Sequence, residues 1–345
     1  MRLPRNHYLL TQRHPTRLLM DGIIRKLTRG AYDIQQLRIA TGLRVVAQFR
    51  DRFNVPEPVT DVQLDHATTG EARAALDAEA KEKADKQRDA LLKQIRIHFD
   101  RVTDGIVATQ RRKTYHFDDV FKDETDVWFM ENYMGILDQE QQAFKRLERA
   151  LGKNGFYNDW LANVKGIGPA MAGVLISELD PYRAKYPSSF WKYSGLDVVT
   201  VVDPETHDIV RTEGRRNFKH HLVESTYTDR DGKEQTKMGL SYNPWLKTKL
   251  LAVMAPSFLK CSHPVYSKMY YDYKLRQLNR PELKDNKAVK AIAHKRALRY
   301  VAKMFLRDLH TAWRTYEGLE VYPSYEEAKL GMTHGRDPSA EAARQ

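Results

Sequence analysis

A glycine turn between two apolar segments constrains the fold of this chain more than any other feature. Residues 163–179 read NVKGIGPAMAGVLISEL, with two glycines one residue apart directly before a proline. Proline suits the first turn of a helix, where no backbone N–H is needed, so a helix is predicted to begin at Pro169. The apolar residues Trp160 and Leu161 predict a short helix over 156–164. The pattern is therefore that of a helix-hairpin-helix.

The turn of this hairpin allows two interpretations. In the first, its glycines expose backbone N–H groups at a helix N-terminus, where a phosphate oxygen binds well and no base is read. In the second, the turn is only a tight connection between two core helices. The flanking positive charge favours the first, and the predicted DNA-contacting residues of the turn are Lys165, Gly166, Ile167 and Gly168, with Ile167 filling the pocket between the helices.

Basic residues are concentrated toward the two ends of the chain. Residues 1–60 hold 11 Lys and Arg against 4 Asp and Glu, and residues 241–320 hold 16 against 6, whereas residues 61–150 hold 15 against 19. This segregation, in a chain of net charge +12, predicts contact with a polyanion at both ends. The alternative is a generally charged surface that keeps the protein in solution.

Composition bounds the class of protein. The 345 residues are 41% hydrophobic, which predicts a globular protein of two or three domains. No stretch approaches the ~20 consecutive apolar residues of a membrane span, so no membrane partner is expected. The single cysteine, Cys261, excludes an internal disulfide and fits a reducing compartment, so a cytoplasmic, nucleoid-associated protein is expected.

The first half of the chain is predicted to be helical. Residues 31–53 favour two short helices around Thr41-Gly42, as a plain helical hairpin rather than a helix-turn-helix, and residues 55–61 favour an extended linker. Residues 71–101 are rich in strong helix formers. Residues 126–151 carry a heptad seam, which predicts either an antiparallel helical pair or a homo-oligomer through a coiled coil; its residues are Ile136, Leu137, Phe144, Leu147 and Leu151.

Five acidic residues lie between these two long helices. They could bind Mg²⁺, but acidic residues before a helix are also common N-terminal caps, and we favour caps or a solvated loop. The cluster comprises Asp118, Asp119, Asp123, Glu124 and Asp126.

Two further regions are candidates for contact with nucleic acid. Residues 198–237 alternate around Asp203-Pro204 and Asp231-Gly232, which predicts short β-hairpins, and a basic run beside them is a candidate phosphate-contacting arm: Arg215, Arg216, Lys219, His220 and His221. The adjacent histidines would face opposite ways on a strand, so no metal is assigned to them. The last long helix, residues 291–314, carries Lys295 and Arg299 on a basic side that contacts nucleic acid or solvent.

The predicted fold is therefore mainly α, with a helical N-terminal segment, a coiled-coil helical hairpin and a helix-hairpin-helix domain that holds inserted β-hairpins. The predicted domains are a basic segment over 1–65, long helices over 66–155, a helix-hairpin-helix domain over 156–320 and a flexible tail over 321–345.

The order of features from residue 130 to 315 resembles the C-terminal domain of a transposase family. These insertion-sequence transposases are guided by a bridge RNA and join a DEDD RuvC-like nuclease domain to a serine-bearing helix-hairpin-helix domain. The resemblance rests on a helix before VKGIGPAMAGVLISELDPYRAKYPSSFWKYSGL, on SYNPWLKTKLL and on the basic last helix. It covers about half the chain. Residues 1–65 show neither the apolar strand nor the acidic residues of a RuvC-like domain.

The resemblance implies a DNA transposase or recombinase. It implies a nucleophilic serine, whose nearest counterpart is Ser241, although the Lys-x-Gly part of the family's serine motif is missing; the other interpretation of Ser241 is a helix cap. It also places Lys247 at the DNA, implies a structured guide RNA as a partner, and implies Mg²⁺ if the protein is catalytic. The alternatives are a non-catalytic nucleic-acid-binding protein that lacks the nuclease half and a protein-binding helical scaffold.

Overall fold

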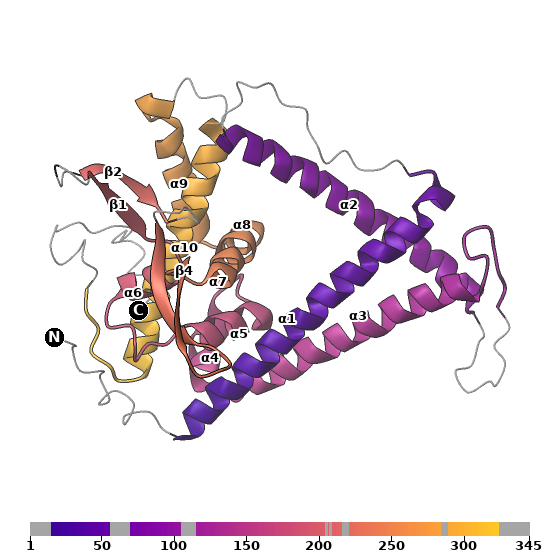
Figure 1. Ribbon diagram of the computed structural model, residues 1–345, viewed down its shortest axis with the longest axis horizontal. Helices are drawn as coiled ribbons and strands as arrows, with labels where there is room; N and C mark the ends of the chain where they lie inside the picture. Colours follow the sequence, from indigo (N-terminus) through magenta and orange to yellow (C-terminus); the bar gives the residue numbers. More distant parts are fainter. Residues whose placement is uncertain are drawn as a thin grey trace. The chain divides into compact units, whose positions relative to one another are not determined.

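The computed structural model describes residues 15–55, 70–104, 115–203, 206, 209–215, 221–283 and 289–323. Within them the chain is mainly α-helical with short antiparallel hairpins, which confirms the predicted fold class (Figure 1). It divides into two compact units. The helical unit comprises residues 26–149 and 285–292, and the hairpin unit comprises the remainder of the chain.

Long helices build the helical unit: most of α1 (Pro15–Phe49), α2 (Gly70–Val102) and nearly all of α3 (Glu124–Leu151). A short 3₁₀ turn, η2 (Arg50–Phe53), continues α1. The core of the unit draws on these helices and on the loop before α3, and its fully buried side chains include Val45, Phe49, Ile95, Phe121, Val127 and Met130. The alanine-rich helix α2 thus packs against this core through apolar residues of its C-terminal half, Leu91, Ile95 and Val102.

The predicted break at Thr41-Gly42 is wrong, because α1 runs without interruption through both residues. Gly42 lies at a contact of α1 with both other long helices. A Cβ atom there would stand 3.1 Å from Cε2 of Tyr133 in α3 and 3.5 Å from Cδ1 of Leu92 in α2. The glycine therefore serves helix packing rather than a turn.

We expect the substitution Gly42→Leu to lower the free energy of unfolding by about 1–3 kcal/mol, because the added atoms overpack the contact with Tyr133. Gly30, in the same helix, has nothing within 4 Å of an added Cβ. Gly30→Ala should therefore stabilise the protein by up to about 1 kcal/mol through helix propensity. Urea unfolding followed by circular dichroism measures both changes. A stabilising Gly42→Leu substitution would contradict the packing role.

The heptad seam of α3 packs within the chain. Ile136 and Leu147 are buried, and Phe144 meets Tyr32 of α1 edge to face, with ring centres 5.5 Å apart. Glu140, also on α3, accepts hydrogen bonds from Gln35 and Arg38 of α1. The helical-pair alternative thus accounts for this seam, and a homo-oligomer remains a prediction.

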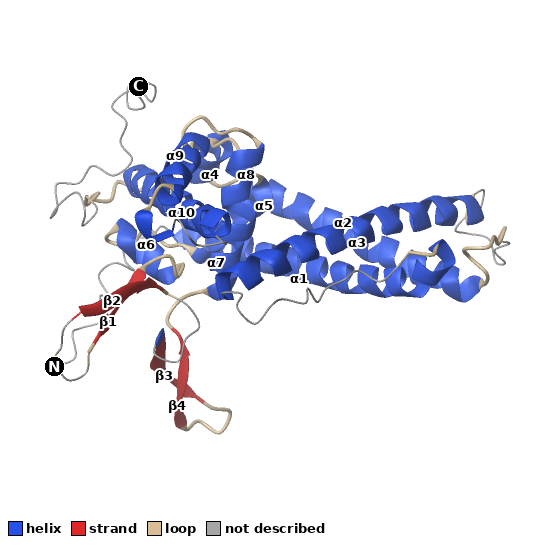
Figure 2. Ribbon diagram, turned by 90° about the horizontal axis from the view of Figure 1, so that it is seen from above, coloured by secondary structure: helices blue, strands red, loops and turns tan. Residues whose placement is uncertain are grey.

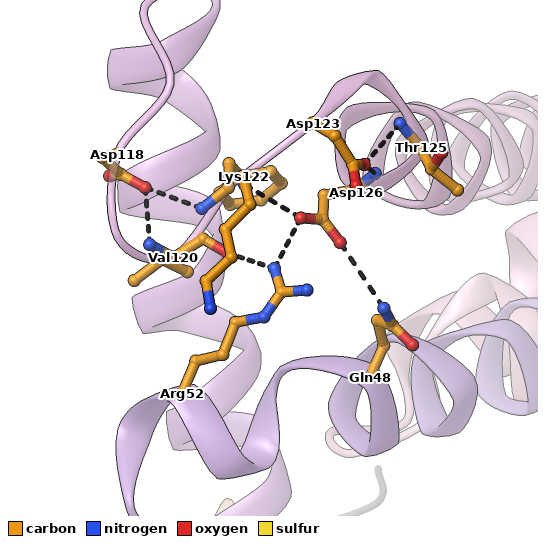
Figure 3. A network of polar contacts seen from close by, with 9 residues as sticks. Gln48, Arg52, Asp118, Val120, Lys122, Asp123, Thr125 and Asp126 are labelled. Atoms are coloured by element: carbon orange, nitrogen blue, oxygen red, sulfur yellow. Dashed lines mark hydrogen bonds and ion pairs between the residues drawn. The ribbon is translucent and has the colours of Figure 1, made fainter.

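Three acids of the cluster before α3, Asp118, Asp123 and Asp126, act as capping or pairing groups (Figure 3). Oδ1 of Asp123 accepts hydrogen bonds from the N–H groups of Thr125 and Asp126, at 2.8 and 3.0 Å, which caps α3. Oδ1 of Asp118 accepts from Val120 N–H and Phe121 N–H, at 2.8 and 2.7 Å. This confirms the capping interpretation.

Asp126 is the most buried of these acids. Its Oδ2 lies 2.6 Å from Nη1 of Arg52 and accepts a 2.9 Å hydrogen bond from Lys122 N–H, and its side chain is only 2% exposed (Figure 3). Burial acts to raise the pKa of Asp126, but the hydrogen bonds from Arg52 and Lys122 and the charge of Arg52 outweigh it and lower that pKa. Carboxylate oxygens of Asp118, Asp123 and Asp126 already accept hydrogen bonds from backbone N–H groups or from Arg52. This arrangement does not fit a Mg²⁺ site. Among the described residues no group of three or more His, Cys, Asp or Glu is placed to hold a metal ion.

The hairpin unit has short helices around one long one. It comprises α4 (Gly155–Asp159), η3 (Leu161–Asn163), α5 (Pro169–Glu178), α6 (Pro187–Tyr193), β1 (Val198–Val202), β2 (Ile209–Gly214), β3 (Leu222–Thr228), β4 (Glu234–Leu240), α7 (Pro244–Thr248), the π-helical η5 (Lys249–Met254), α8 (Ala255–Lys260), α9 (Tyr266–Leu278), η6 (Pro281–Leu283) and most of α10 (Val289–Tyr316). The helix predicted over 156–164 is thus divided into α4 and η3.

Aromatic rings fill the centre of the hairpin unit. Phe156 of α4 stacks on Trp313 of α10, with centroids 4.8 Å apart and planes 7° apart. Phe258 of α8 and Tyr266 of α9 both contact Phe305, which lies about two turns before Trp313 on α10. The apolar side of α10 is therefore the surface on which the shorter helices assemble.

The predicted β-hairpins are present as separate ribbons. β1 pairs antiparallel with β2, from Val198 opposite Gly214 to Val202 opposite Ile209, with a bulge after Val201. β3 pairs antiparallel with β4, from Leu222 opposite Leu240 to Thr228 opposite Glu234. Both ribbons project from the helices around them (Figure 2). Among the described residues, no helix combines the length and apolar character needed to cross a membrane.

Candidate nucleic-acid interface

The turn between η3 and α5 has the predicted hairpin geometry. Ile167 is 7% exposed and Lys165 is exposed, so the apolar side chain points inward and the cation outward. Gly166 has φ +95°, a left-handed conformation that glycine adopts without strain. The core positions predicted for the following helix, Met171 and Leu175 among them, are buried.

The two glycines of this turn have different surroundings. A Cβ on Gly166 would stand 3.0 Å from Sγ of Cys261 and 3.1 Å from Cδ1 of Phe258, and the carbonyl of Gly166 accepts a 2.7 Å hydrogen bond from Ser257 Oγ. Gly166 thus packs against α8. Gly168 is exposed, has φ −86° and has nothing within 4 Å of an added Cβ. Packing therefore requires glycine at 166 but not at 168.

Gly168 is the N-cap of α5, and a glycine cap supplies no side-chain acceptor. Pro169 at the first helical position has no N–H group. The N–H groups of Ala170 and Met171 precede the first intrahelical bond, which runs from Ala172 N–H to Gly168 O at 3.0 Å. In the part of the chain that the structure describes, these two donors have no acceptor. An anion at this end of α5 would meet free N–H groups, the helix dipole and no side chain at Gly168.

A polar cluster joins the β1–β2 ribbon to the start of α7. Arg215, directly after β2, is paired with Asp197, directly before β1, through Nε at 2.9 Å from Oδ1 and Nη2 at 2.9 Å from Oδ2. Its Nη1 donates a 2.7 Å hydrogen bond to Ser241 Oγ. Lys247 Nζ donates to the carbonyl of Arg215 at 2.7 Å and lies 4.5 Å from the ring centre of Tyr242.

Three predicted site residues, Ser241, Arg215 and Lys247, thus come together. The hydrogen bonds and the charge of Asp197 raise the pKa of Arg215 despite an opposing effect of burial, so its guanidinium stays charged. Both cations are held by protein groups, which makes them supports of the ribbon at least as much as contacts for phosphate.

The capping alternative for Ser241 is wrong, because Asn243 is the cap of α7. Asn243 Oδ1 accepts a 3.0 Å hydrogen bond from Leu246 N–H. Its Nδ2 donates to Oε2 of Glu178, the last residue of α5, at 2.7 Å. Ser241 lies two residues before this cap and accepts a hydrogen bond from Arg215 instead. An arginine donor cannot remove the hydroxyl proton, so this contact does not supply a general base.

The predicted cations of α10 have unequal surroundings. Lys295 is exposed. Arg299 is half-buried and lies over the backbone of Gly214, where a side chain would collide with its guanidinium. Arg216, Lys219 and His220 lie outside the described residues, and His221 is buried with Nε2 3.1 Å from Oε1 of Glu213. The partner Asp197 was not predicted, because it precedes Arg215 by 18 positions and only the ribbon brings them together.

Comparison with protein-family models, with curated proteins and with solved structures finds no match to the chain.

Proposed function

We propose that this protein is a transposase-like DNA-binding protein that acts in DNA transposition or recombination at the nucleoid. It contacts the sugar-phosphate backbone through the turn at residues 165–168. One observation carries the proposal: the exposed Gly168 gives access to the unsatisfied N–H groups of α5, although packing does not require glycine there. The exposed Lys165 adds a positive charge, and the resemblance stated above supplies the recombination context.

This mode of contact is independent of base sequence, since backbone N–H groups and a lysine read only phosphate. Specificity for a target would come from elsewhere, for example from a guide RNA. The chain has net charge +12, which supports binding to a polyanion.

We expect the substitution Gly168→Val to weaken binding of duplex DNA about 10-fold, because its side chain keeps a phosphate away from the N–H groups. Lys165→Glu should weaken binding by a similar factor and reduce the slope of log K against log salt by about 1. Fluorescence anisotropy with duplex, four-way-junction and single-stranded DNA and with structured RNA, at two salt concentrations, measures both effects.

The controls separate binding from folding. Gly168→Val should cost no more than about 1 kcal/mol of stability, as for a poor N-cap, and leave the circular dichroism spectrum unchanged. Lys145→Glu makes the same charge change at an exposed site on α3 and should leave affinity within twofold. If the affinity for DNA changes neither with salt concentration nor with either hairpin substitution, the proposal is overturned and the protein-binding helical scaffold is the remaining alternative.

Catalysis at Ser241 is a separable question. We expect Ser241→Ala to leave DNA binding unchanged, because its hydroxyl is engaged by Arg215 and the neighbouring Asn243 contacts Glu178 at the C-terminal end of α5, whereas the hairpin turn lies at the N-terminal end. A strand-transfer activity that Ser241→Ala abolishes would establish the enzyme, and wild-type protein that binds without strand transfer would establish the non-catalytic alternative.

A further inference from the structure

Helix α9 presents an exposed aromatic ring beside lysines. Tyr271 is 61% exposed and Leu275, one turn later, is 60% exposed. Lys268 and Lys274 lie three residues before and after Tyr271, and residues at this spacing share one face of a helix. Tyr266, Tyr270 and Gln277 are buried and anchor the opposite side of α9. The ring of Tyr271 is therefore held on a fixed helix and faces outward.

Helix α10 adds positive charge to this face. Tyr270 contacts Tyr271 edge to face, with ring centres 5.1 Å apart, and its hydroxyl lies 2.5 Å from Nδ1 of His294 on α10. Lys274 Nζ lies 5.5 Å from the ring centre of Tyr270. Lys295 follows His294 directly on α10 and is exposed. Burial lowers the pKa of His294, and the charges of Lys274 and Lys295 lower it further. Asp272 is the exposed acid beside them.

A second pair of rings stiffens the same helix pair. Tyr273 of α9 and Tyr300 of α10 stack with centroids 4.3 Å apart and planes 13° apart, and Cζ of Arg276 lies 4.8 Å from the centre of the Tyr273 ring. The exposed ring is thus part of a rigid aromatic and basic surface, so little side-chain entropy would be lost when a ligand stacks on it.

We propose that this α9 face binds unpaired bases of a nucleic acid. A base stacks on the ring of Tyr271, and Lys268, Lys274 and Lys295 contact the phosphates on either side. Aromatic rings interleaved with cations are the arrangement that binds single strands, and bases inside an intact duplex are already stacked on their neighbours. The inference rests on the proposed function, and it adds unpaired nucleotides to the duplex contact made by the hairpin.

The experiment uses the full chain, an intact duplex, the same duplex with a short single-stranded gap, and 2-aminopurine in the gap. We expect wild-type protein to quench the 2-aminopurine fluorescence. Tyr271→Ala should abolish the quench and weaken binding of the gapped DNA about 5- to 100-fold, as for one stacked base, with intact duplex unchanged within twofold. Tyr271→Phe, which keeps the ring, should behave as wild type.

Trp128 supplies the matched control. It is an exposed aromatic, 57% exposed, on α3 of the helical unit, but Glu124 and Glu131 lie one turn on either side of it. Trp128→Ala should change neither affinity nor quench. The inference is overturned if Tyr271→Ala weakens binding of the intact and the gapped duplex equally, or weakens neither. It is also overturned if wild-type protein binds gapped DNA without quenching the 2-aminopurine fluorescence.

The two proposals fail separately. Gly168→Val should weaken every substrate, whereas Tyr271→Ala should weaken only those with unpaired bases. One result would overturn the hairpin contact and support the α9 face: Tyr271→Ala alters binding, whereas Gly168→Val and Lys165→Glu leave it unchanged. If the protein binds none of the DNAs, both proposals are overturned. An acidic protein would then be the partner that fits the lysines of the hairpin turn and of the α9 face.

Discussion

Replacement of Asp126 by Asn should lower the free energy of unfolding of the helical unit by about 3–5 kcal/mol, since removing one member of a buried ion pair leaves the other charge uncompensated. The Asp126 side chain is 2% exposed and that of Arg52 is 19% exposed, with their charged atoms 2.6 Å apart. An amide in place of the carboxylate also weakens the acceptor for Lys122 N–H. Arg52 further donates to the carbonyl of Val120, so its misplacement would loosen the loop before α3.

Hydrogen exchange measured by mass spectrometry locates the effect. Peptides from α1 and α3 should lose protection in Asp126→Asn, and peptides from α5 should not, because the substitution lies in the other compact unit. The matched control is Glu82→Gln, which breaks the Glu82–Lys86 pair on α2. Those side chains are 68% and 75% exposed, and the expected loss is below about 1 kcal/mol. A similarly small loss in Asp126→Asn would show that the buried pair contributes no more than an exposed one.

Acidification from pH 7 to pH 5 should destabilise the hairpin unit by about 2 kcal/mol through one residue, His310. Its side chain is fully buried, and Nε2 lies 2.7 Å from the carbonyl of Ala184. Burial lowers the pKa of His310 to about 4, and the charge of Arg314 acts in the same direction against the hydrogen bond to Ala184. The folded state thus keeps His310 neutral down to about pH 4, whereas the unfolded chain binds a proton below about pH 6.5. Stability from this residue is complete above pH 6.5 and is lost progressively down to pH 4.

His310→Gln removes this titration and leaves an amide that can still donate to Ala184. We expect most of the difference in stability between pH 7 and pH 5 to disappear in this variant, measured by urea unfolding at both values. His294, whose pKa is also lowered but which is less buried than His310, is the control: His294→Gln should retain most of the pH dependence. Asp126, whose pKa is lowered, loses its contribution only at more acidic pH. An unchanged pH dependence in His310→Gln would contradict the burial argument.

The sequence determined the local structures of this protein. The apolar spacing after Pro169 predicted a helix that is present, and the acids before residue 126 predicted the caps of α3. Alternation around Asp231-Gly232 predicted the β3–β4 ribbon, in which Gly232 has φ +79° and Asp229 caps the turn through Asp231 N–H. These features depend on residues that lie a few positions apart in the chain, so a short segment of sequence contains their physical cause.

Tertiary structure decided which contacts give these local elements their roles. Gly42 was predicted to break the helix because glycine is a poor helix former. In the structure α1 is continuous there, and the close contact with α2 and α3 leaves no room for a larger side chain. Gly166 and Gly168 look alike in sequence, and only the position of α8 shows that one is packed and the other open. Ser241 became a partner of Arg215 rather than a cap because the β1–β2 ribbon carries Arg215 back to it across 26 positions. Each of these outcomes depends on which distant side chain arrives within contact distance, and short-range periodicity does not contain that information.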